Sequence, residues 1–151
     1  MPSKKNKKTS IQNPPITQKL ARSFLHEHNE QVFKWAIRSD KIDCKHCQFG
    51  FNIDVQNIFI SEIKPHLDSY ATMKWEDVKK RKSCHYFDVV DLGKDLQDRI
   101  FELFKDSAPE TLFQIKLNST HRIFGYVENG IFYLLFNDPQ HQGYIVEKKH
   151  T

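Results

Sequence analysis

The sequence predicts an α+β fold: a twisted antiparallel sheet of four to six strands with helices packed on one face. Apolar residues recur at helical spacing through the middle of the chain, most clearly in residues 91–107. The last third alternates apolar and polar residues, which is the period of a strand. Within it, Asn129-Gly130 predicts a tight hairpin, because both central residues of a type I′ turn need a positive φ angle.

The length and composition are those of one soluble domain. The 151 residues are 38% hydrophobic and 28% charged, and no apolar run approaches the ~18 residues that cross a bilayer. Residues 1–22 carry six basic side chains and no acid, whereas the other 17 basic side chains stand against 19 acidic ones. We therefore expect a disordered basic tail over 1–22 and a single, mildly acidic α+β domain over 23–151. Such a tail either keeps a protein soluble or holds a polyanion loosely.

Cysteine usage bears on the compartment and on metal binding. Three cysteines, an odd number, without a signal-peptide pattern predict reduced thiols and a cytoplasmic location. Cys44-x-x-Cys47 is a zinc half-site, but Cys84-His85 is a poor second half, because neighbouring strand residues point to opposite faces. Free thiols are the favoured interpretation, so we expect no metal. Motifs for nucleotide hydrolysis, dinucleotide binding and zinc proteolysis are absent, and no cofactor is expected.

The first two thirds of the chain predict short strands and then helices. Residues 33–37 and 49–51 are typical of short strands. Residues 55–70 have helical spacing, and Pro65 is expected to kink or split that helix. The remaining expected elements before the 91–107 helix are a short helix within residues 72–82 and a strand over 83–90.

The hairpin turn predicts which residues face each other. If Glu128 faces Ile131, then Arg122 faces Asn137 and His121 faces Asp138. One side of the sheet is then nearly pure apolar and should pack under the 91–107 helix; it carries Phe113, Ile115, Leu117, Ile123, Gly125, Val127, Phe132, Leu134 and Phe136. The other side should face away from the core; it carries Gln114, Lys116, Arg122, Phe124, Tyr126, Tyr133, Leu135 and Asn137.

Polar residues gather at the open end of this hairpin, where either a site or a plain strand end is expected. In the second interpretation Arg122 and Asp138 form an ion pair or a turn contact, and His141 is a loop histidine after the Asp138-Pro139 turn. In the first interpretation, these residues and their polar neighbours together form a catalytic or binding site. Taken as a group, they support the two interpretations about equally.

HRIFGY followed by IFYLLFNDPQHQGY resembles the strand motif Y-R-(V/I)-x-Y and the late His or Arg before an aromatic in the RelE/ParE toxin superfamily. This likeness covers the C-terminal half, and its matching positions are Arg122, Ile123, Tyr126, His141 and Tyr144. Residues 55–145 also resemble a family of mostly uncharacterised bacterial and phage proteins. The positions that carry this second likeness are Thr72 and Trp75, Cys84 and His85, Arg122 to Gly125, and Phe132 to His141.

Many RelE/ParE toxins are ribonucleases that cleave mRNA on the ribosome without a metal ion. The resemblance therefore implies a RelE-like fold and an RNA-acting toxin or effector of a toxin–antitoxin or phage-defence module. It implies RNA or the ribosome as one partner, and an antitoxin or another protein as a second. A non-catalytic module that binds protein or nucleic acid through the same sheet face is the alternative.

Metal-independent RNA cleavage needs a base for the 2′-OH proton, an acid for the leaving 5′-oxygen and a cation for the phosphate. Histidine suits the proton transfers and arginine suits the phosphate. We expect the catalytic residues to be Arg122, His141, His85 and Lys116, with the choice of general base left open. The expected binding residues, of which the tyrosines can stack bases, are Tyr126, Tyr133, Tyr144, Asn137 and His121.

Overall fold

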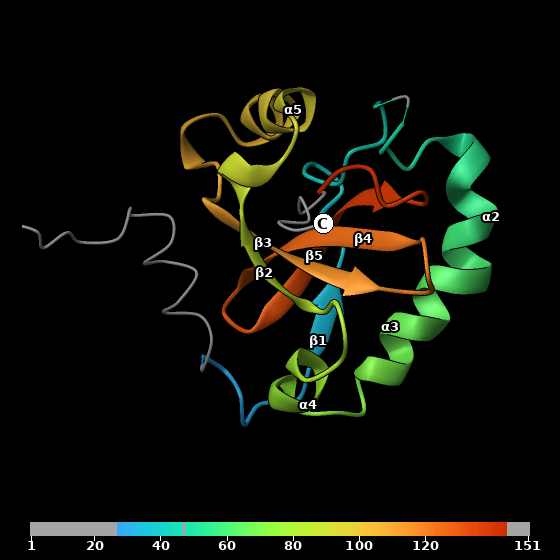
Figure 1. Ribbon diagram of the computed structural model, residues 1–151, viewed down its shortest axis with the longest axis vertical. Coiled ribbons are helices and arrows are strands. Elements are labelled where there is room, and N and C mark those ends of the chain that lie inside the picture. Colours follow the sequence, from blue (N-terminus) through green and yellow to red (C-terminus); the bar gives the residue numbers. More distant parts are fainter. Residues whose placement is uncertain (1–26, 47, 145–151) are drawn as a thin grey trace, which may run out of the picture.

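The structure, a computed structural model, describes residues 27–46 and 48–144, so the expected tail over 1–22 lies outside the described residues. These residues form helices and a five-stranded sheet in the order β1-β5-β4-β3-β2, which confirms the α+β prediction and the number of strands (Figure 1). The strands are β1 (Lys34–Ala36), β2 (His85–Asp88), β3 (Thr111–Lys116), β4 (Arg122–Glu128) and β5 (Ile131–Asp138).

The sheet is mixed, where the sequence predicted it to be antiparallel. Strands β2 to β5 pair antiparallel, but β1 pairs with β5 in parallel. Two parallel neighbouring strands must be joined by a long connection. Here the connection from β1 to β5 contains all the helices from α2 to α5. The expected strand at 49–51 is wrong. This segment lies along β5 as a loop, and its Phe49 carbonyl accepts a 2.8 Å hydrogen bond from the Asn137 N–H.

The helices follow the predicted order. The first helical region contains a 3-10 turn (Ile53–Val55), α2 (Gln56–Ile58), a π-helical turn (Phe59–Ile63) and α3 (Lys64–Tyr70). Pro65 lacks an N–H and its ring crowds the carbonyl four residues earlier, so the widened π turn before it confirms the predicted split. The other helices are α4 (Trp75–Lys79) and α5 (Lys94–Phe104), with 3-10 turns at Val89–Asp91 and Lys105–Ser107.

Helices cover both faces of the sheet, where the sequence predicted one (Figure 1). On one face, α3 and α4 pack on the predicted apolar side, which includes Phe113, Ile123 and Leu134. On the opposite face, α5 packs on residues that were expected to face away from the core. The apolar residues of this α5 face include Leu96, Ile100, Phe104, Phe124, Tyr126 and Leu135. Both faces are therefore buried, and the expected packing of α5 on the first face is wrong.

The hairpin begins in the predicted register and then shifts. Asn129 and Gly130 have φ angles of 54° and 80°, and Glu128 faces Ile131, as predicted. Beyond Gly125 the register moves by one residue, so that Leu135 is an extra residue in a β-bulge. Arg122 therefore faces Asp138, and the predicted pairing of Arg122 with Asn137 is wrong. A Cβ atom on Gly125 would collide with the Tyr133 carbonyl and the Phe132 ring, which explains the glycine beside the bulge.

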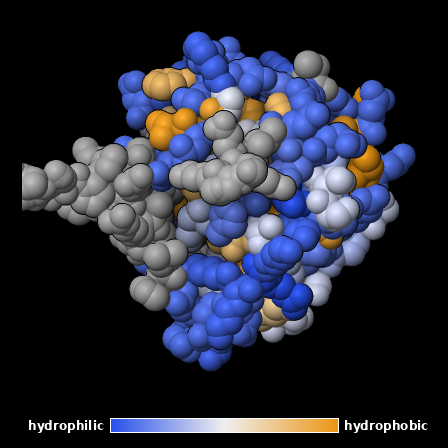
Figure 2. Space-filling model, in the orientation of Figure 1, coloured by the Kyte–Doolittle hydropathy of each residue, from blue (hydrophilic) through white to orange (hydrophobic). Residues whose placement is uncertain are grey.

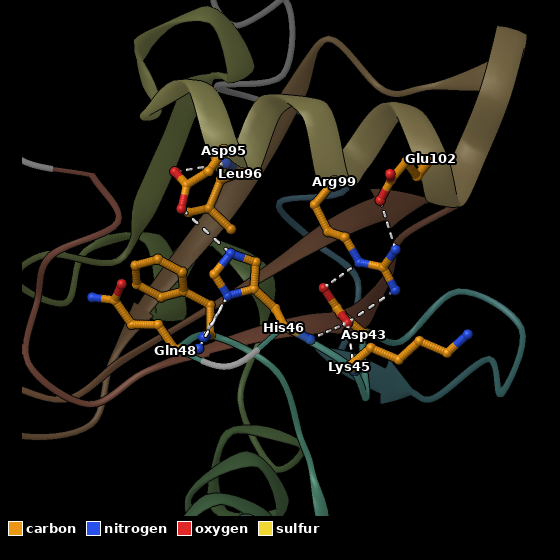
Figure 3. Close-up of polar contacts among 9 residues, drawn as sticks. Asp43, Lys45, His46, Gln48, Asp95, Leu96, Arg99 and Glu102 are labelled. Carbon is orange, nitrogen blue, oxygen red and sulfur yellow. Dashed lines mark hydrogen bonds and ion pairs between the residues drawn. The ribbon is translucent and has the colours of Figure 1, made fainter.

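A buried ion pair fastens the loop after β1 to α5 (Figure 3), and a backbone hydrogen bond of its acidic residue, Asp43, joins the loop to β5. Asp43 is fully buried, and its carboxylate accepts hydrogen bonds from Arg99 Nε at 2.9 Å and Arg99 Nη2 at 3.3 Å. The same carboxylate accepts the N–H groups of Lys45 at 2.8 Å and His46 at 3.1 Å. The Asp43 N–H donates to the carbonyl of Leu135, the bulged residue, at 3.0 Å.

His46 makes a second attachment of this loop. Its Nδ1 accepts the N–H groups of Gln48 at 3.1 Å and Phe49 at 3.2 Å, which leaves Nε2 at 3.3 Å from the carboxylate of Asp95 on α5 (Figure 3). The loop is thus bound to α5 at two points, through Arg99 and Asp95.

The side of the molecule in view in Figure 2 is mostly hydrophilic, with separate hydrophobic spots. The exposed large hydrophobic residues of the described chain are Val32, Ile37, Ile53, Ile60, Val90 and Phe101. Within residues 27–46 and 48–144, no helix has both the length and the apolar character that crossing a membrane requires.

Replacing Asp43 with alanine should lower the free energy of unfolding by about 3 kcal/mol, because it leaves the largely buried Arg99 and two loop N–H groups without their acceptor. Urea denaturation measures this change. The control is Asp98→Ala, which breaks the exposed Lys94–Asp98 pair and should cost roughly 0–1 kcal/mol. If Asp43→Ala lowered the free energy of unfolding no more than the roughly 0–1 kcal/mol expected for Asp98→Ala, the Asp43 cluster would not stabilise the fold.

The Asp43 carboxylate should also affect how the free energy of unfolding falls at acid pH. Burial alone would raise the pKa of Asp43, but the hydrogen bonds from Arg99, Lys45 and His46 and the charge of Arg99 outweigh it and lower the pKa. The stabilisation is therefore present above about pH 3.9, the ordinary aspartate value, and is lost as the pH falls through the lower folded value. Urea titrations between pH 2 and 5 should show a shallower loss in Asp43→Ala than in the parent.

Candidate functional site

Side chains suited to RNA chemistry converge at one end of the α5 face. Lys116 on β3 lies directly opposite Arg122 on β4, and Asp138 on β5 completes this row. In the next row, His85 on β2 lies opposite Gln114 on β3. Because strand residues two apart share a face, both rows lie on the side where α5 packs. The structure thus brings together three of the four expected catalytic residues, and the fourth, His141, follows β5.

Arg122 lies at the floor of this cluster, and its side chain is buried rather than exposed as expected. The residue is 5% exposed, and its Nη1 donates a 2.7 Å hydrogen bond to the carbonyl of Asn118 in the β3–β4 turn. Its Nε is buried and has no hydrogen-bond partner among the described residues. Burial lowers the pKa of the guanidinium, and the charge of Asp138 partly offsets this. Arginine keeps its charge under such shifts.

Asp138 holds the loop after β5 instead of pairing with Arg122. Its two carboxylate oxygens accept the N–H groups of Gln142 at 2.9 Å and Gly143 at 2.8 Å. Between the described residues, no Arg122–Asp138 ion pair is formed within 4.0 Å. The expected ion pair is therefore wrong, whereas the turn contact expected as its alternative is present at Asn118.

His141 stands in this loop with a φ angle of 55°, and its side chain is half-buried. Burial lowers the pKa of its imidazole, and the positive charges of Arg122 and Lys116 lower it further, against the charge of Asp138. The pKa of His141 thus responds to the charges of both cations, and the imidazole is held in its neutral form over a wider pH range than that of a free histidine.

His85 and Tyr144 form the opposite border of the cluster. His85 is exposed, and its Nδ1 lies 3.1 Å from the carbonyl of Tyr86, so Nδ1 is the donor in that contact. The Tyr144 ring stacks on Phe87 with a centroid distance of 4.4 Å and lies 6.1 Å from the His85 ring. Tyr144, an expected base-stacking residue, is thus beside an expected catalytic one.

Gln114 is a site residue that the sequence analysis did not select. It is 2% exposed, its Nε2 donates to the Ser83 carbonyl at 2.9 Å, and its Oε1 is buried without a partner in the described chain. Since its cross-strand partner is Phe124, Gln114 is a diagonal neighbour of Arg122. The one available signal was a polar residue between the apolar Phe113 and Ile115 in the interior of β3.

Two expected binding residues, His121 and Asn137, lie on the other face of the sheet: His121 by strand alternation next to Arg122, and Asn137 because of the bulge. His121 is 4% exposed, and its Nε2 hydrogen bonds with the side-chain oxygen of Asn137. Its Nδ1 lies 3.7 Å from the carboxylate of Glu62 in the π turn before α3. Asn137 faces Ile123, on the α3 side, because the register has shifted. His121 and Asn137 therefore lie on the opposite side of the sheet from Lys116 and Arg122.

Tyr126 and Tyr133 lie towards the other end of the α5 face. Tyr126 is four residues from Arg122 along β4, or about 13 Å. The two tyrosine rings stack at 5.0 Å with planes 17° apart, beside Phe104 of α5. They are therefore separate from the cluster around Arg122.

Cys44 and Cys84, which the sequence analysis weighed as zinc ligands, lie in different parts of the fold. Cys44 is exposed, whereas Cys84 is buried on the α3 side with its Sγ 3.7 Å from the Tyr70 hydroxyl. Cys47 lies outside the described residues. No group of three His, Cys, Asp or Glu side chains in the described ranges could hold a metal ion.

Comparison of the chain with protein-family models, with curated proteins and with solved structures finds no match in any of the three. The likeness to the RelE/ParE superfamily stays a prediction from the sequence. Function is therefore inferred from the chemistry of the site.

Replacing Arg122 with alanine should lower the free energy of unfolding by about 1–3 kcal/mol, because a buried side chain and its bond to the Asn118 turn are lost. Lys116→Ala removes the half-buried cation opposite it and should change stability by less than about 0.5 kcal/mol. Leu134→Ala, in the core on the α3 side, should cost ~2–5 kcal/mol. Urea denaturation compares the three; an Arg122→Ala variant as stable as the parent would contradict its buried, hydrogen-bonded position.

Proposed function

We propose that the protein binds RNA and cleaves it without a metal ion, as an endoribonuclease. One observation carries the proposal. Groups for proton transfer and for phosphate binding, namely His85, Lys116, Arg122 and His141, gather at one end of one sheet face. Beneath them, the buried Nε of Arg122 and Oε1 of Gln114 have no partner in the described chain, and a bound polar substrate would satisfy such atoms.

Arg122 and Lys116 are the groups for the phosphate. They face each other across β3 and β4, so two positively charged residues lie side by side on this face. Arg122 is held by the Asn118 carbonyl and by burial, which fixes its position before the substrate arrives. A fixed cation in a partly dry site stabilises the charge that builds on the phosphate better than a mobile one in water.

His141 is the group best suited to act as the base. Burial, together with the cations that would bind the phosphate, lowers the pKa of His141 and so favours its neutral form, which can accept a proton. In the proposed reaction His141 takes the proton of the 2′-OH, and the 2′-oxygen forms a bond to phosphorus. The bond from phosphorus to the 5′-oxygen breaks, which leaves a 2′,3′-cyclic phosphate.

His85 in its protonated form would return a proton to the leaving 5′-oxygen. It is exposed at the border of the cluster, and its Nδ1 is engaged with the Tyr86 carbonyl, so Nε2 is the nitrogen that faces away from the backbone. Tyr144 beside it offers a ring on which one base can stack.

We infer a toxin or effector of a toxin–antitoxin or phage-defence module as the setting, from the RelE/ParE resemblance. RNA, alone or on the ribosome, is the proposed substrate, an antitoxin is the proposed protein partner, and the cytoplasm is the proposed location. The second candidate is a non-catalytic module that binds RNA or protein through the same face. It is favoured by Arg122, which is buried and already donates to the Asn118 carbonyl.

Cleavage of a labelled oligoribonucleotide by the purified protein, with EDTA present, tests the proposal. His141→Ala and His85→Ala should each reduce the rate by about 10²-fold or more, because each removes a proton-transfer group. Neither side chain is deeply buried, so both variants should keep their melting temperature. Lys64→Ala, an exposed lysine on α3, is the matched control and should cleave at the parent rate.

Two outcomes would count against cleavage by this site. Parent activity in His141→Ala and His85→Ala would place the chemistry elsewhere. Salt-dependent binding of the oligonucleotide with no cleavage would favour the non-catalytic module.

The pH dependence of kcat/KM gives a second test. Because the pKa of His141 is lowered, the acid limb should have its midpoint below about 6.5, the ordinary histidine value. Lys116→Ala removes a charge that lowers this pKa, so it should move the limb to higher pH, whereas Lys64→Ala should not. A limb that moves to lower pH in Lys116→Ala would exclude His141 as the base.

A further inference from the structure

A cavity of about 310 Å³ lies between the C-terminal end of α5 and the hairpin end of the sheet. Phe104 of α5, Tyr126 and Glu128 of β4, and Arg38 and Lys41 from the loop after β1 contribute to its walls. Its volume is at the lower end of the range for small-molecule sites. It shares no residue with the cluster around Arg122.

Tyr126 gives the cavity an unused polar group. The residue is 6% exposed, and its hydroxyl is buried and makes no hydrogen bond with any described residue. The Arg38 guanidinium lies close enough to interact with it, although the contact does not reach regular hydrogen-bond geometry. Burial raises the pKa of this phenol and the charge of Arg38 partly offsets the rise, so the hydroxyl keeps its proton and can donate. Buried hydroxyl groups nearly always have a partner, and a ligand in the cavity would supply one.

Aromatic rings and cations surround this hydroxyl. The Phe104 ring meets the Tyr126 ring edge-on at 5.1 Å. The guanidinium of Arg38 lies 4.9 Å from the centre of the Tyr133 ring, behind Tyr126, and the Lys41 ammonium lies 5.2 Å from that of Phe104. Both cations therefore stand beside aromatic rings: Phe104, next to Lys41, lines the cavity itself, and Tyr133, next to Arg38, stacks behind Tyr126, which lines it.

The charges at the rim are available to a ligand. Glu128 lies 3.7 Å from Arg38, with both side chains about half exposed, and such surface pairs are weak. Lys41 donates one hydrogen bond, to the Leu103 carbonyl, and forms only a long, surface pair of 3.9 Å with the exposed carboxylate of Asp40, so its ammonium keeps donors for a ligand. Two cations and one carboxylate beside aromatic rings match a ligand with an anionic group, a flat body and an amino group.

We propose that this cavity binds one nucleotide unit whose base carries an exocyclic amino group. The base would lie against Phe104, its amino group would donate to Glu128, and the phosphate would meet Arg38 and Lys41 and accept a hydrogen bond from the Tyr126 hydroxyl. The inference rests on the proposed function in taking RNA as the source of that unit. Tyr126 lies about 13 Å along β4 from Arg122, so the cavity would hold a nucleotide away from the cleaved bond.

Calorimetry with 5′-AMP, adenosine and inorganic phosphate tests the pocket directly. 5′-AMP should bind, and adenosine should bind roughly tenfold or more weakly because it lacks the group that meets the two cations. Tyr126→Phe should weaken 5′-AMP binding by roughly two- to tenfold through loss of one hydrogen bond. Its melting temperature should stay the same or rise, because the variant lacks the unpaired buried hydroxyl. Arg38→Ala should weaken binding by roughly tenfold or more.

Matched variants on the other side of the sheet control for the loss of a hydroxyl and of a charge. Tyr70→Phe removes a tyrosine hydroxyl in the α3 cluster, and Lys64→Ala removes an exposed lysine of α3. Both should bind 5′-AMP as the parent does. Binding that is absent at millimolar 5′-AMP, unchanged in Tyr126→Phe and Arg38→Ala, or matched by inorganic phosphate alone would overturn the proposal.

A short adenosine-containing oligoribonucleotide should compete with 5′-AMP, and failure to compete would overturn RNA as the source. These measurements need no cleavage, so they fail separately from the proposed function. If the protein binds 5′-AMP through Tyr126 and Arg38 but does not cleave RNA, the proposed pocket stands and the proposed function fails. If the protein cleaves RNA but does not bind 5′-AMP, the proposed function stands and only the proposed pocket fails.

Discussion

The buried carboxylate of Asp43 is the contact on which the arrangement of the other elements depends. It accepts hydrogen bonds from Arg99 of α5 and from two N–H groups of its own loop, while its backbone binds the carbonyl of Leu135 in β5 (Figure 3). One residue thus joins a helix, a loop and a strand that are far apart in the sequence. A buried charge is tolerated only when it is paired in this way, so the loop has little freedom to take another position.

The bulge at Leu135, which Asp43 contacts, decides the composition of the candidate site. An extra residue in β5 reverses the alternation beyond it, so Asp138 joins the α5 face and Asn137 moves to the α3 face. Asp138 then accepts the N–H groups of Gln142 and Gly143 and so shapes the loop that carries His141. Without the bulge, Asp138 would lie on the other face and the loop would lose this support.

The α5 helix divides one sheet face into two regions that hold the candidate site and the proposed pocket. Its apolar side packs on Phe124 and Leu135 in the middle of the face. The cluster around Arg122 lies at one end, and the cavity beside Tyr126 lies near the C-terminal end of the helix. Each region combines buried polar groups with cations, and the covering helix keeps the middle of the face dry. Charged and polar groups act more strongly in such surroundings than in open water.

By itself, the sequence determined what depends on neighbours in the chain: the α+β class, the helix of residues 91–107, the split at Pro65 and the Asn129-Gly130 turn. These features follow from periodicity, the missing N–H of proline and positive φ angles, all of which are local. It also selected His85, Lys116, Arg122 and His141 by their chemistry. Only the tertiary structure decided the parallel pairing of β1, the bulge, the second buried face and the burial of Arg122. Each of these depends on contacts between distant segments, and a repeat of hydrophobic residues carries no information about which distant segment will cover it.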